Sequence, residues 1–264
     1  MIDGDGFEGG TARMMRSGLK IAALIAFAAS GWILAGLLIW SPERAERWRG
    51  ALTGDAETSA LRALKQETAA AELRRARLRN GAPVYVLGDS LAAGVEAAAI
   101  APGAVNLAVG RDRLATLSWR IARYDFLDDA RVIVLAAGVN DLIAGAGVET
   151  VSARFETLLD QLPRAPVAAA AILPVDEAAI ARHGGRAVTN AKIAEANARI
   201  EEICAARSNC RFVAQPAGLR DAEGALRDDV HEGDGLHLNG RGARLWAAVL
   251  SAAVKDAEAA QAAD

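Results

Sequence analysis

The stretch "VYVLGDSLAAG", Val84 to Gly94, joins an apolar run to a short polar turn. Its first four residues are apolar, a pattern typical of a strand that is buried on both faces of a parallel sheet. A Gly-Asp-Ser triplet ends this run, and small residues that favour a helix follow it. The pattern therefore predicts that Ser90 lies at the carboxyl end of a buried strand, on the turn into a helix.

Four more short apolar runs follow the first one, and helical stretches separate them. The expected further strands are Val105–Ala108, Val132–Ala136, Val167–Leu173 and Phe212–Val213. The expected helices are Leu91–Ile100, Leu114–Tyr124, Val148–Leu162, Ala191–Ala206 and Ala243–Ala253. This alternation predicts an α/β fold with a central, mostly parallel five-stranded sheet and helices on both faces. Ligands of such sheets bind beyond the carboxyl ends of the strands, so we expect the chemistry there.

Ser90 occupies a position that suits a nucleophile, because a hydroxyl on a strand-to-helix turn can project beyond the sheet. The structural alternative is that Ser90 only caps the helix and that Asp89 only forms the turn. A serine nucleophile needs a base, and the chain has 3 histidines.

The histidine that best fits the role of base is His237, which follows Asp234 by three residues in "DGLH" and precedes the last expected helix. The aspartate could then orient the imidazole. Asp228 and His231 have the same spacing in "DDVH" and are a competing pair. We expect His231 to decorate the preceding loop and His183 to lie in a surface turn.

Two strand ends offer hydrogen-bond donors for an oxyanion. Gly110 follows the second expected strand, and glycine allows a backbone N–H to approach a ligand closely. Asn140 follows the third strand and carries a side-chain amide. Alternatively, Gly110 only makes a turn, and Asn140 with Asp141 only caps the next helix.

Together these residues make the sequence resemble the SGNH, or GDSL, hydrolase family of serine esterases and lysophospholipase-like lipases. The family marks are matched by Ser90 in "GDSL", Gly110 in "AVGRD", Asn140 in "GVND", and Asp234 with His237 in "DGLH". The resemblance implies a catalytic triad of Ser90, His237 and Asp234. It also implies an oxyanion hole made by the N–H of Ser90, Gly110 and Asn140.

The resemblance covers Pro83 to Val254 and implies a three-layer, flavodoxin-like fold. It implies acyl transfer through a covalent acyl-enzyme, with no metal ion and no organic cofactor. One departure concerns Arg111, which stands where many relatives carry the glycine of the second motif. The oxyanion donor is therefore either the N–H of Gly110 or that of Arg111. The Gly-Arg pair is also similar to membrane-linked SGNH acyltransferase domains, which keeps an O-acyltransferase activity open.

The segment 21–40, "IAALIAFAASGWILAGLLIW", carries no charged residue and has about the length that spans a bilayer. It predicts a retained membrane anchor, and the alternative is a cleaved signal peptide. We expect residues 1–20 to form a tail, 41–81 a helical stalk, 82–258 the SGNH domain and 259–264 a C-terminal tail. Basic residues flank both sides of the anchor, so charge leaves its orientation undecided.

The 2 cysteines, Cys204 and Cys210, are close enough in sequence for a short-loop disulfide. Such a bridge predicts an oxidising compartment, and two free buried thiols are the alternative. With the anchor, it indicates a single-pass protein of a bacterial inner membrane with a periplasmic catalytic domain. The net charge of −3, with basic residues scattered among acids, argues against a nucleic-acid partner.

For the substrate, this location favours small acyl esters, above all acetyl esters of envelope sugars, with lipid esters as the next choice. There are two competing hypotheses. One is an O-acyltransferase, and the other is a non-catalytic envelope protein that keeps the fold. The sequence indicates no oligomeric state.

Overall fold

A computed structural model of the chain describes residues 83–182 and 188–263. The predicted tail 1–20, the predicted anchor 21–40 and the predicted stalk 41–81 lie outside these residues, and so does His183. Within the described ranges, no helix combines the length and the apolar character that a membrane span requires.

The centre of the described domain is a five-stranded sheet in the order β2-β1-β3-β4-β5. All four neighbouring pairs are parallel. The strands are β1 (Val84–Gly88), β2 (Val105–Asn106), β3 (Val132–Ala136), β4 (Val167–Ala170) and β5 (Cys210–Val213). Every residue of β1, β3 and β4 is buried, as their apolar runs predict. The predicted α/β fold with a parallel five-stranded sheet is confirmed, and its strand order is that of flavodoxin-like folds.

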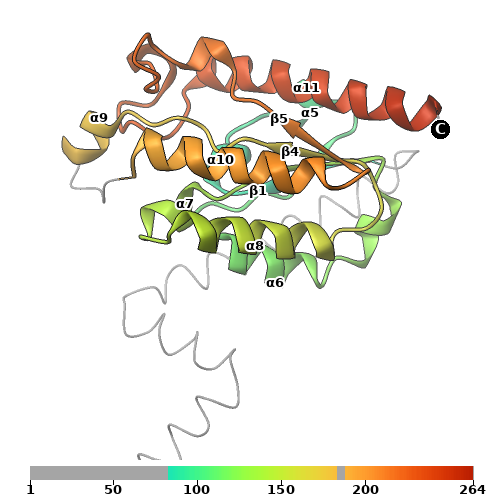
Figure 1. Ribbon diagram of the computed structural model, residues 1–264. Helices are drawn as coiled ribbons and strands as arrows, with labels where there is room; N and C mark the ends of the chain where they lie inside the picture. The colour runs from blue at the N-terminus through green and yellow to red at the C-terminus, as the bar shows by residue number, and fades with distance from the viewer. Residues whose placement is uncertain (1–82, 183–187, 264) are drawn as a thin grey trace, which may run out of the picture. The chain divides into compact units, whose positions relative to one another are not determined.

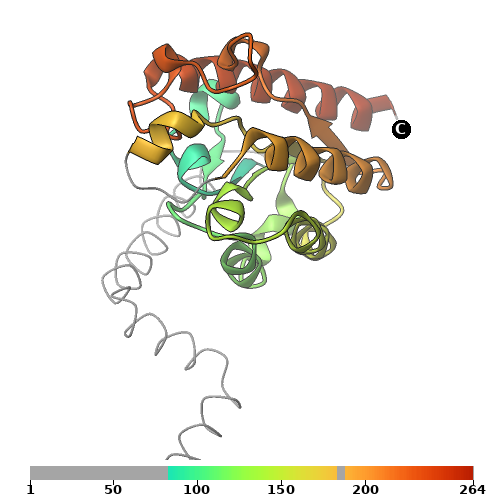
Figure 2. The ribbon, with the colours of Figure 1, turned by 60° about the vertical axis from the view of Figure 1, so that its left-hand side comes forward.

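Helices cover both faces of the sheet (Figures 1 and 2). They are α4 (Ser90–Ala93), α5 (Ala97–Ile100), α6 (Leu114–Ile121), α7 (Val139–Ile143), α8 (Val148–Gln161), α9 (Glu177–Arg182), α10 (Asn190–Ala205) and α11 (Gly240–Ala263). Three short 3-10 helices span Asp125–Asp129, Ala217–Leu219 and Asp228–Val230. Helices α6, α8 and α10 pack side by side on one face, and α5 and α11 pack together on the other.

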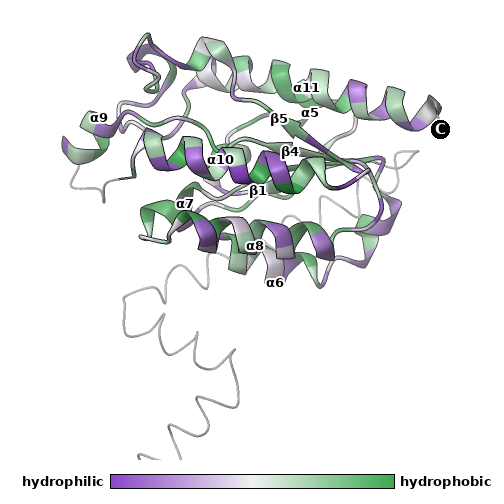
Figure 3. Cartoon of the chain, in the orientation of Figure 1, coloured by the Kyte–Doolittle hydropathy of each residue, from purple (hydrophilic) through white to green (hydrophobic). Residues whose placement is uncertain are grey.

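The long helices bury one side and expose the other. In α8 the buried residues include Val148, Val151, Phe155 and Leu158, which recur every three or four positions. Figure 3 shows the result as apolar and polar residues that alternate along the helices. This amphipathic spacing explains why the helical stretches could be recognised from the sequence.

The ends of several elements differ from the prediction. The stretch expected as one helix after Ser90 forms two, α4 and α5, because Gly94 caps the first of them. The fourth strand ends at Ala170 instead of Leu173, since the side chain of Asn197 takes over both backbone groups of Ile172 at 2.8 and 2.9 Å. These bonds replace the pairing that a longer strand would need.

The last helix is longer than predicted at both ends. Helix α11 begins at Gly240 and runs to Ala263, so most of the segment 259–264, expected as a tail, is helical. Trp246, Leu250 and Val254 on this helix are buried and continue the apolar stripe toward the C-terminus. The stripe holds the helix against β3, β4 and β5.

Cys204 and Cys210 form a disulfide between the end of α10 and the start of β5. Their Cα atoms lie 5.0 Å apart, within the ordinary range for such a bond. The bond closes the turn that returns the chain from the helix layer to the edge strand of the sheet.

Candidate active site

Ser90 lies where the sequence predicts it, two positions after the end of β1 and at the first residue of α4. The strand approaches β3 so closely at this end that a Cβ atom on Gly88 would lie 2.2 Å from the carbonyl oxygen of Ala136. Only glycine fits there, and the close approach fixes the direction in which the chain leaves the sheet. The side chain of Asp89 caps α4 by accepting a hydrogen bond from the Leu91 N–H at 3.0 Å. Capping is thus done by Asp89 and leaves the Ser90 hydroxyl available.

His237 faces this hydroxyl from the loop that precedes α11. Its Nε2 atom lies 3.0 Å from Ser90 Oγ, and its Nδ1 atom lies 2.5 Å from Oδ2 of Asp234. A carboxylate only accepts hydrogen bonds, so Nδ1 carries the proton and Nε2 is free to accept the serine proton. Ser90, His237 and Asp234 are therefore brought together in the order that nucleophilic catalysis by serine requires.

The carboxylate of Asp234 is held in its charged form by the residues that follow it. Partial burial opposes its ionisation, but hydrogen bonds from the His237 ring and from the N–H groups of Leu236 and His237 outweigh this effect and lower the pKa of Asp234. A charged carboxylate at this place stabilises the imidazolium that forms when His237 takes a proton.

The turn after β2 contains the second group of predicted residues, Gly110 and Arg111. The Asp112 N–H donates to the Val109 carbonyl at 3.2 Å and closes a four-residue turn. Arg111, at the third position, has a φ of 67° and is the one non-glycine residue in the described ranges with a positive φ. Type II turns prefer glycine at this position. Neither the Gly110 N–H nor the Arg111 N–H is engaged in a hydrogen bond within the described ranges.

Asn140, on α7, is tied to the same turn. Its Nδ2 donates to the carbonyl of Asp112 at 3.0 Å, which leaves its second amide hydrogen for another acceptor. A second contact holds the turn in place, because buried Asp112 forms an ion pair with buried Arg120 at 2.5 Å. The structure therefore joins the turn that carries Gly110 to Asn140, as an oxyanion hole built from both would require.

Three buried carboxylates lie under the site, on Asp89, Asp112 and Asp141. The pKa of Asp89 is raised to about 7, mainly by burial and in part by the nearby charges of Asp112 and Asp141, which together outweigh the opposing hydrogen bond from Leu91. Asp141 accepts hydrogen bonds from the Leu114 N–H at 2.8 Å and from Arg154 at 2.7 Å. The pKa of Asp89 therefore lies near neutral pH instead of in the usual range of an aspartate.

The prediction for His231 is wrong. Instead of decorating a loop, His231 is buried, and its Nδ1 accepts hydrogen bonds from the N–H groups of Gly233 and Gly235 at 2.9 and 3.2 Å. Its Nε2 lies 3.7 Å from Asp228 Oδ1, too far for a hydrogen bond, so these two residues do not form a second base-carboxylate pair. The sequence gives no signal for this, because the spacing of Asp228 and His231 equals that of Asp234 and His237.

Sequence analysis also missed residues that contact the neighbours of the candidate site residues. These are Arg120, which pairs with Asp112, Arg154, which pairs with Asp141, and Asn239, whose amide donates to the carbonyls of Asp229 and His231 at 3.1 and 3.2 Å. Asn239 stands two residues after His237, in a position where a cap for the last helix could have been predicted. The two arginines offer no comparable sequence signal, since their partners are distant.

Comparisons with known proteins found a matching family profile. The profile of the "GDSL-like Lipase/Acylhydrolase family" matches residues 86–245, a range that contains all the candidate site residues. No curated protein matches the chain significantly.

Solved structures share the fold at low sequence identity. A Streptococcus pneumonia protein provisionally described as a platelet activating factor is 20% identical, with a TM-score of 0.62, over 78% of this chain and 98% of that one. A lipase/acylhydrolase from Enterococcus faecalis is 20% identical, with a TM-score of 0.55, over 66% and 96%. The C-terminal catalytic domain of a peptidoglycan O-acetyltransferase from Streptococcus pneumoniae is 17% identical, with a TM-score of 0.52, over 67% and 95%.

Proposed function

Because this chain belongs to the GDSL-like lipase/acylhydrolase family, we propose that it is a serine esterase that hydrolyses small acyl esters through a covalent acyl-enzyme. The observation that carries the proposal is the hydrogen-bonded series of Ser90, His237 and Asp234, with 3.0 Å between Ser90 Oγ and His237 Nε2. A hydroxyl, an imidazole and a carboxylate in this order activate a serine for attack on a carbonyl carbon.

In the first half of the reaction, Ser90 Oγ bonds to the ester carbonyl carbon while His237 Nε2 takes the hydroxyl proton. The tetrahedral intermediate then collapses, the bond to the alcohol oxygen breaks, and His237 returns the proton to the departing alcohol. In the second half, His237 takes a proton from water, the water oxygen attacks the acyl carbon, and Ser90 Oγ leaves with that proton. Asp234 holds the ring in one tautomer throughout, and the steps use no metal ion or organic cofactor.

The negative charge on the tetrahedral intermediate needs donors that are fixed in place beforehand. We assign this role to the N–H of Ser90, the side-chain amide of Asn140 and the turn that contains Gly110 and Arg111. The left-handed conformation of Arg111 supports its own N–H as the donor of the turn, because this is the position at which a glycine would turn the chain in the same way. Each such donor contributes roughly 3 kcal/mol to transition-state stabilisation in well-studied serine hydrolases.

We propose acetyl and other short acyl esters of envelope sugars or lipids as substrates. The fold is shared with the catalytic domain of a peptidoglycan O-acetyltransferase, which supports a substrate of this class. The disulfide between Cys204 and Cys210 supports a domain in an oxidising compartment. With the apolar segment 21–40, this leads us to propose a single-pass inner-membrane protein with its catalytic domain in the periplasm.

The first experiment is labelling by a serine-directed phosphonate, which we expect in the wild type and not in Ser90→Ala. A screen of short-chain model esters, acetylated sugars and lysophospholipids then identifies the substrate class. An intact wild type that neither reacts with the phosphonate nor hydrolyses any of these esters would favour the non-catalytic envelope protein.

An O-acyltransferase is the second candidate, because the same acyl-enzyme can be resolved by a sugar hydroxyl in place of water. The two activities are separated by offering an acyl donor with and without a sugar acceptor. A hydrolase releases free acid at the same rate in both cases, whereas a transferase forms the new sugar ester faster than free acid.

A further inference from the structure

The catalytic carboxylate is carried by a turn that has little rigidity of its own. Asp234 lies between Gly233 and Gly235, which have φ values of 93° and 78°. Glycine loses more conformational freedom on ordering than any other residue, so a Gly-Asp-Gly turn keeps one conformation only when its surroundings hold it. Hydrogen bonds from the N–H groups of these two glycines can therefore hold the turn in one conformation.

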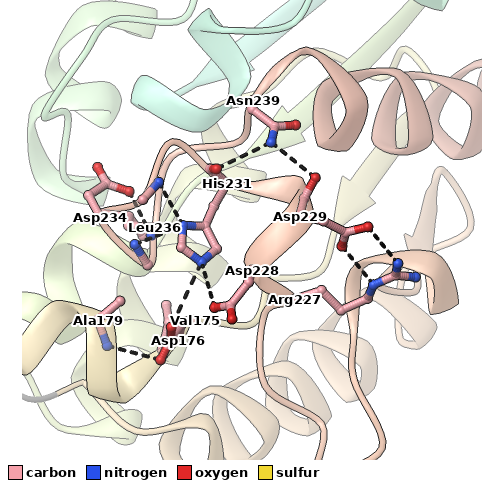
Figure 4. Close-up of polar contacts among 12 residues, drawn as sticks. Val175, Asp176, Ala179, Arg227, Asp228, Asp229, His231, Asp234, Leu236 and Asn239 are labelled. Atoms are coloured by element: carbon pink, nitrogen blue, oxygen red, sulfur yellow. Dashed lines mark hydrogen bonds and ion pairs between the residues drawn. The ribbon is translucent and has the colours of Figure 1, made fainter.

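His231 is the residue that binds both of these N–H groups. Its Nδ1 accepts from Gly233 at 2.9 Å and from Gly235 at 3.2 Å, so one ring atom holds the turn on both sides of Asp234. Figure 4 shows the ring of His231 beside the turn that carries Asp234. The side chain of His231 is 3% exposed, so the residues packed around it restrict the movement of this acceptor atom. A second contact supports the turn, because the Gly235 carbonyl accepts from the Asp176 N–H at 2.9 Å.

These hydrogen bonds also determine which ring nitrogen of His231 carries the proton. An Nδ1 atom that accepts two N–H groups is unprotonated, so the proton of the neutral ring is on Nε2. The Nε2 atom faces Asp176 Oδ2 at 3.8 Å and Asp228 Oδ1 at 3.7 Å, and makes no hydrogen bond within the described ranges. The side chains of Asp176, Asp228 and His231 are spaced closely enough to bind a metal ion together. A protonated Nε2 has no lone pair for a metal, however, and a histidine that binds metal donates through its other nitrogen instead of accepting.

The contacts form one continuous series from His231 to the reacting hydroxyl. His231 holds the turn, Asp234 on the turn orients His237 through a 2.5 Å hydrogen bond, and His237 reaches Ser90. We propose that His231 is a positioning residue for the catalytic aspartate, and that it acts through the acceptor atom Nδ1 alone. The role in turnover rests on the function proposed above, whereas the role in holding the turn does not.

The test compares two variants that separate the acceptor from the bulk of the ring. His231→Asn keeps an acceptor oxygen near the place of Nδ1, and His231→Phe keeps the ring volume without any acceptor. Asp228→Asn is the matched control, because Asp228 faces only the Nε2 side and its side chain is 93% exposed. The measurements are kcat and KM on p-nitrophenyl acetate, the downfield proton NMR signal of the His237 Nδ1–H bonded to Asp234, and amide exchange at Gly233 and Gly235.

We expect His231→Phe to lower kcat roughly tenfold or more at nearly unchanged KM, because a misplaced catalytic group slows the chemical step and not binding. Its downfield proton signal should broaden or move upfield, and the amides of Gly233 and Gly235 should exchange faster. His231→Asn and Asp228→Asn should keep the signal and remain within about threefold of the wild-type kcat.

A folded His231→Phe protein that keeps its kcat, its downfield signal and its slow amide exchange overturns the proposal. If His231→Phe does not fold, His231→Gln takes its place, since its longer side chain provides no acceptor at the position of Nδ1. A wild type that hydrolyses no ester contradicts the proposed function instead, and the proton signal and amide exchange then still decide the role of His231.

Discussion

The Nε2 atom of His237 lies 3.0 Å from the Oγ atom of Ser90, although 147 positions separate the two residues along the chain. The parallel sheet brings the two residues together, because Ser90 follows the carboxyl end of β1 and the loop before α11 lies at the same end of the sheet. The first prediction concerns these two residues.

We expect His237→Ala to lower kcat by about 10⁴-fold or more, because the serine hydroxyl then has no base, whereas the oxyanion donors and substrate binding remain. The measurement is steady-state hydrolysis of a short-chain ester. Ser90→Ala should lose a similar factor, and the double variant should be no worse than either single variant, since the residues act as one unit. Additive losses would contradict a shared mechanism.

Stability should fall as the pH rises toward and through neutrality, because Asp89 is buried with a pKa of about 7. The pKa in the folded state exceeds the unfolded value, so the folded protein binds the extra proton, and its contribution to the free energy of unfolding is lost as the pH rises through about 7. Between pH 5 and pH 8 we expect a loss of roughly 2 kcal/mol in urea denaturation.

The variant Asp89→Asn tests this assignment, because an amide still accepts the hydrogen bond from Leu91 but does not ionise. It should abolish most of the loss between pH 5 and pH 8. Asp228→Asn, at a well-exposed carboxylate, should leave the loss unchanged. Equal pH dependence in wild type and Asp89→Asn would mean that another group is responsible.

Arg111→Gly should stabilise the fold, because Arg111 has a φ of 67° that only glycine adopts without a steric penalty. The left-handed conformation costs a non-glycine residue about 1 kcal/mol, part of which the greater freedom of glycine in the unfolded chain offsets. We expect a rise in Tm of about 2 °C in thermal unfolding. Arg111→Ala removes the same guanidinium but keeps the strain, so its Tm should not rise.

The sheet and the proximity of Ser90, His237 and Asp234 could be predicted because both depend on local patterns. The fully apolar β1 and β3 are typical of buried parallel strands, and Ser90, Asp234 and His237 lie in short motifs next to recognisable elements. The end of β4 could not be predicted in the same way, because Asn197, distant in sequence, takes the backbone groups of Ile172. The strand propensity of the residues around Ile172 does not indicate a contact with a residue so distant in sequence.

The supporting residues of the site were missed for the same physical reason. The burial of His231 depends on the packing of the loop that contains it. The sequence spacing to Asp228 indicates a hydrogen-bonded partner, whereas the fold leaves the two side chains 3.7 Å apart. The positive φ of Arg111 is likewise imposed by the turn between Val109 and Asp112, since arginine itself carries no preference for that conformation. Long-range packing, and not residue type, decides these features.

The disulfide between Cys204 and Cys210 gives the last prediction, which concerns both stability and compartment. Protein purified from the bacterial envelope should contain no free thiol when titrated under denaturing conditions, because the described ranges hold no free cysteine and the sequence has 2 cysteines in all. Reduction should lower the free energy of unfolding by about 2 kcal/mol, the value expected for so short a loop. Comparing oxidised and reduced wild type in urea measures this without altering the packing around buried Cys204. Two free thiols in this protein would remove the argument for an oxidising compartment, whereas the geometry of Ser90, His237 and Asp234 would be unaffected because it does not depend on this bond.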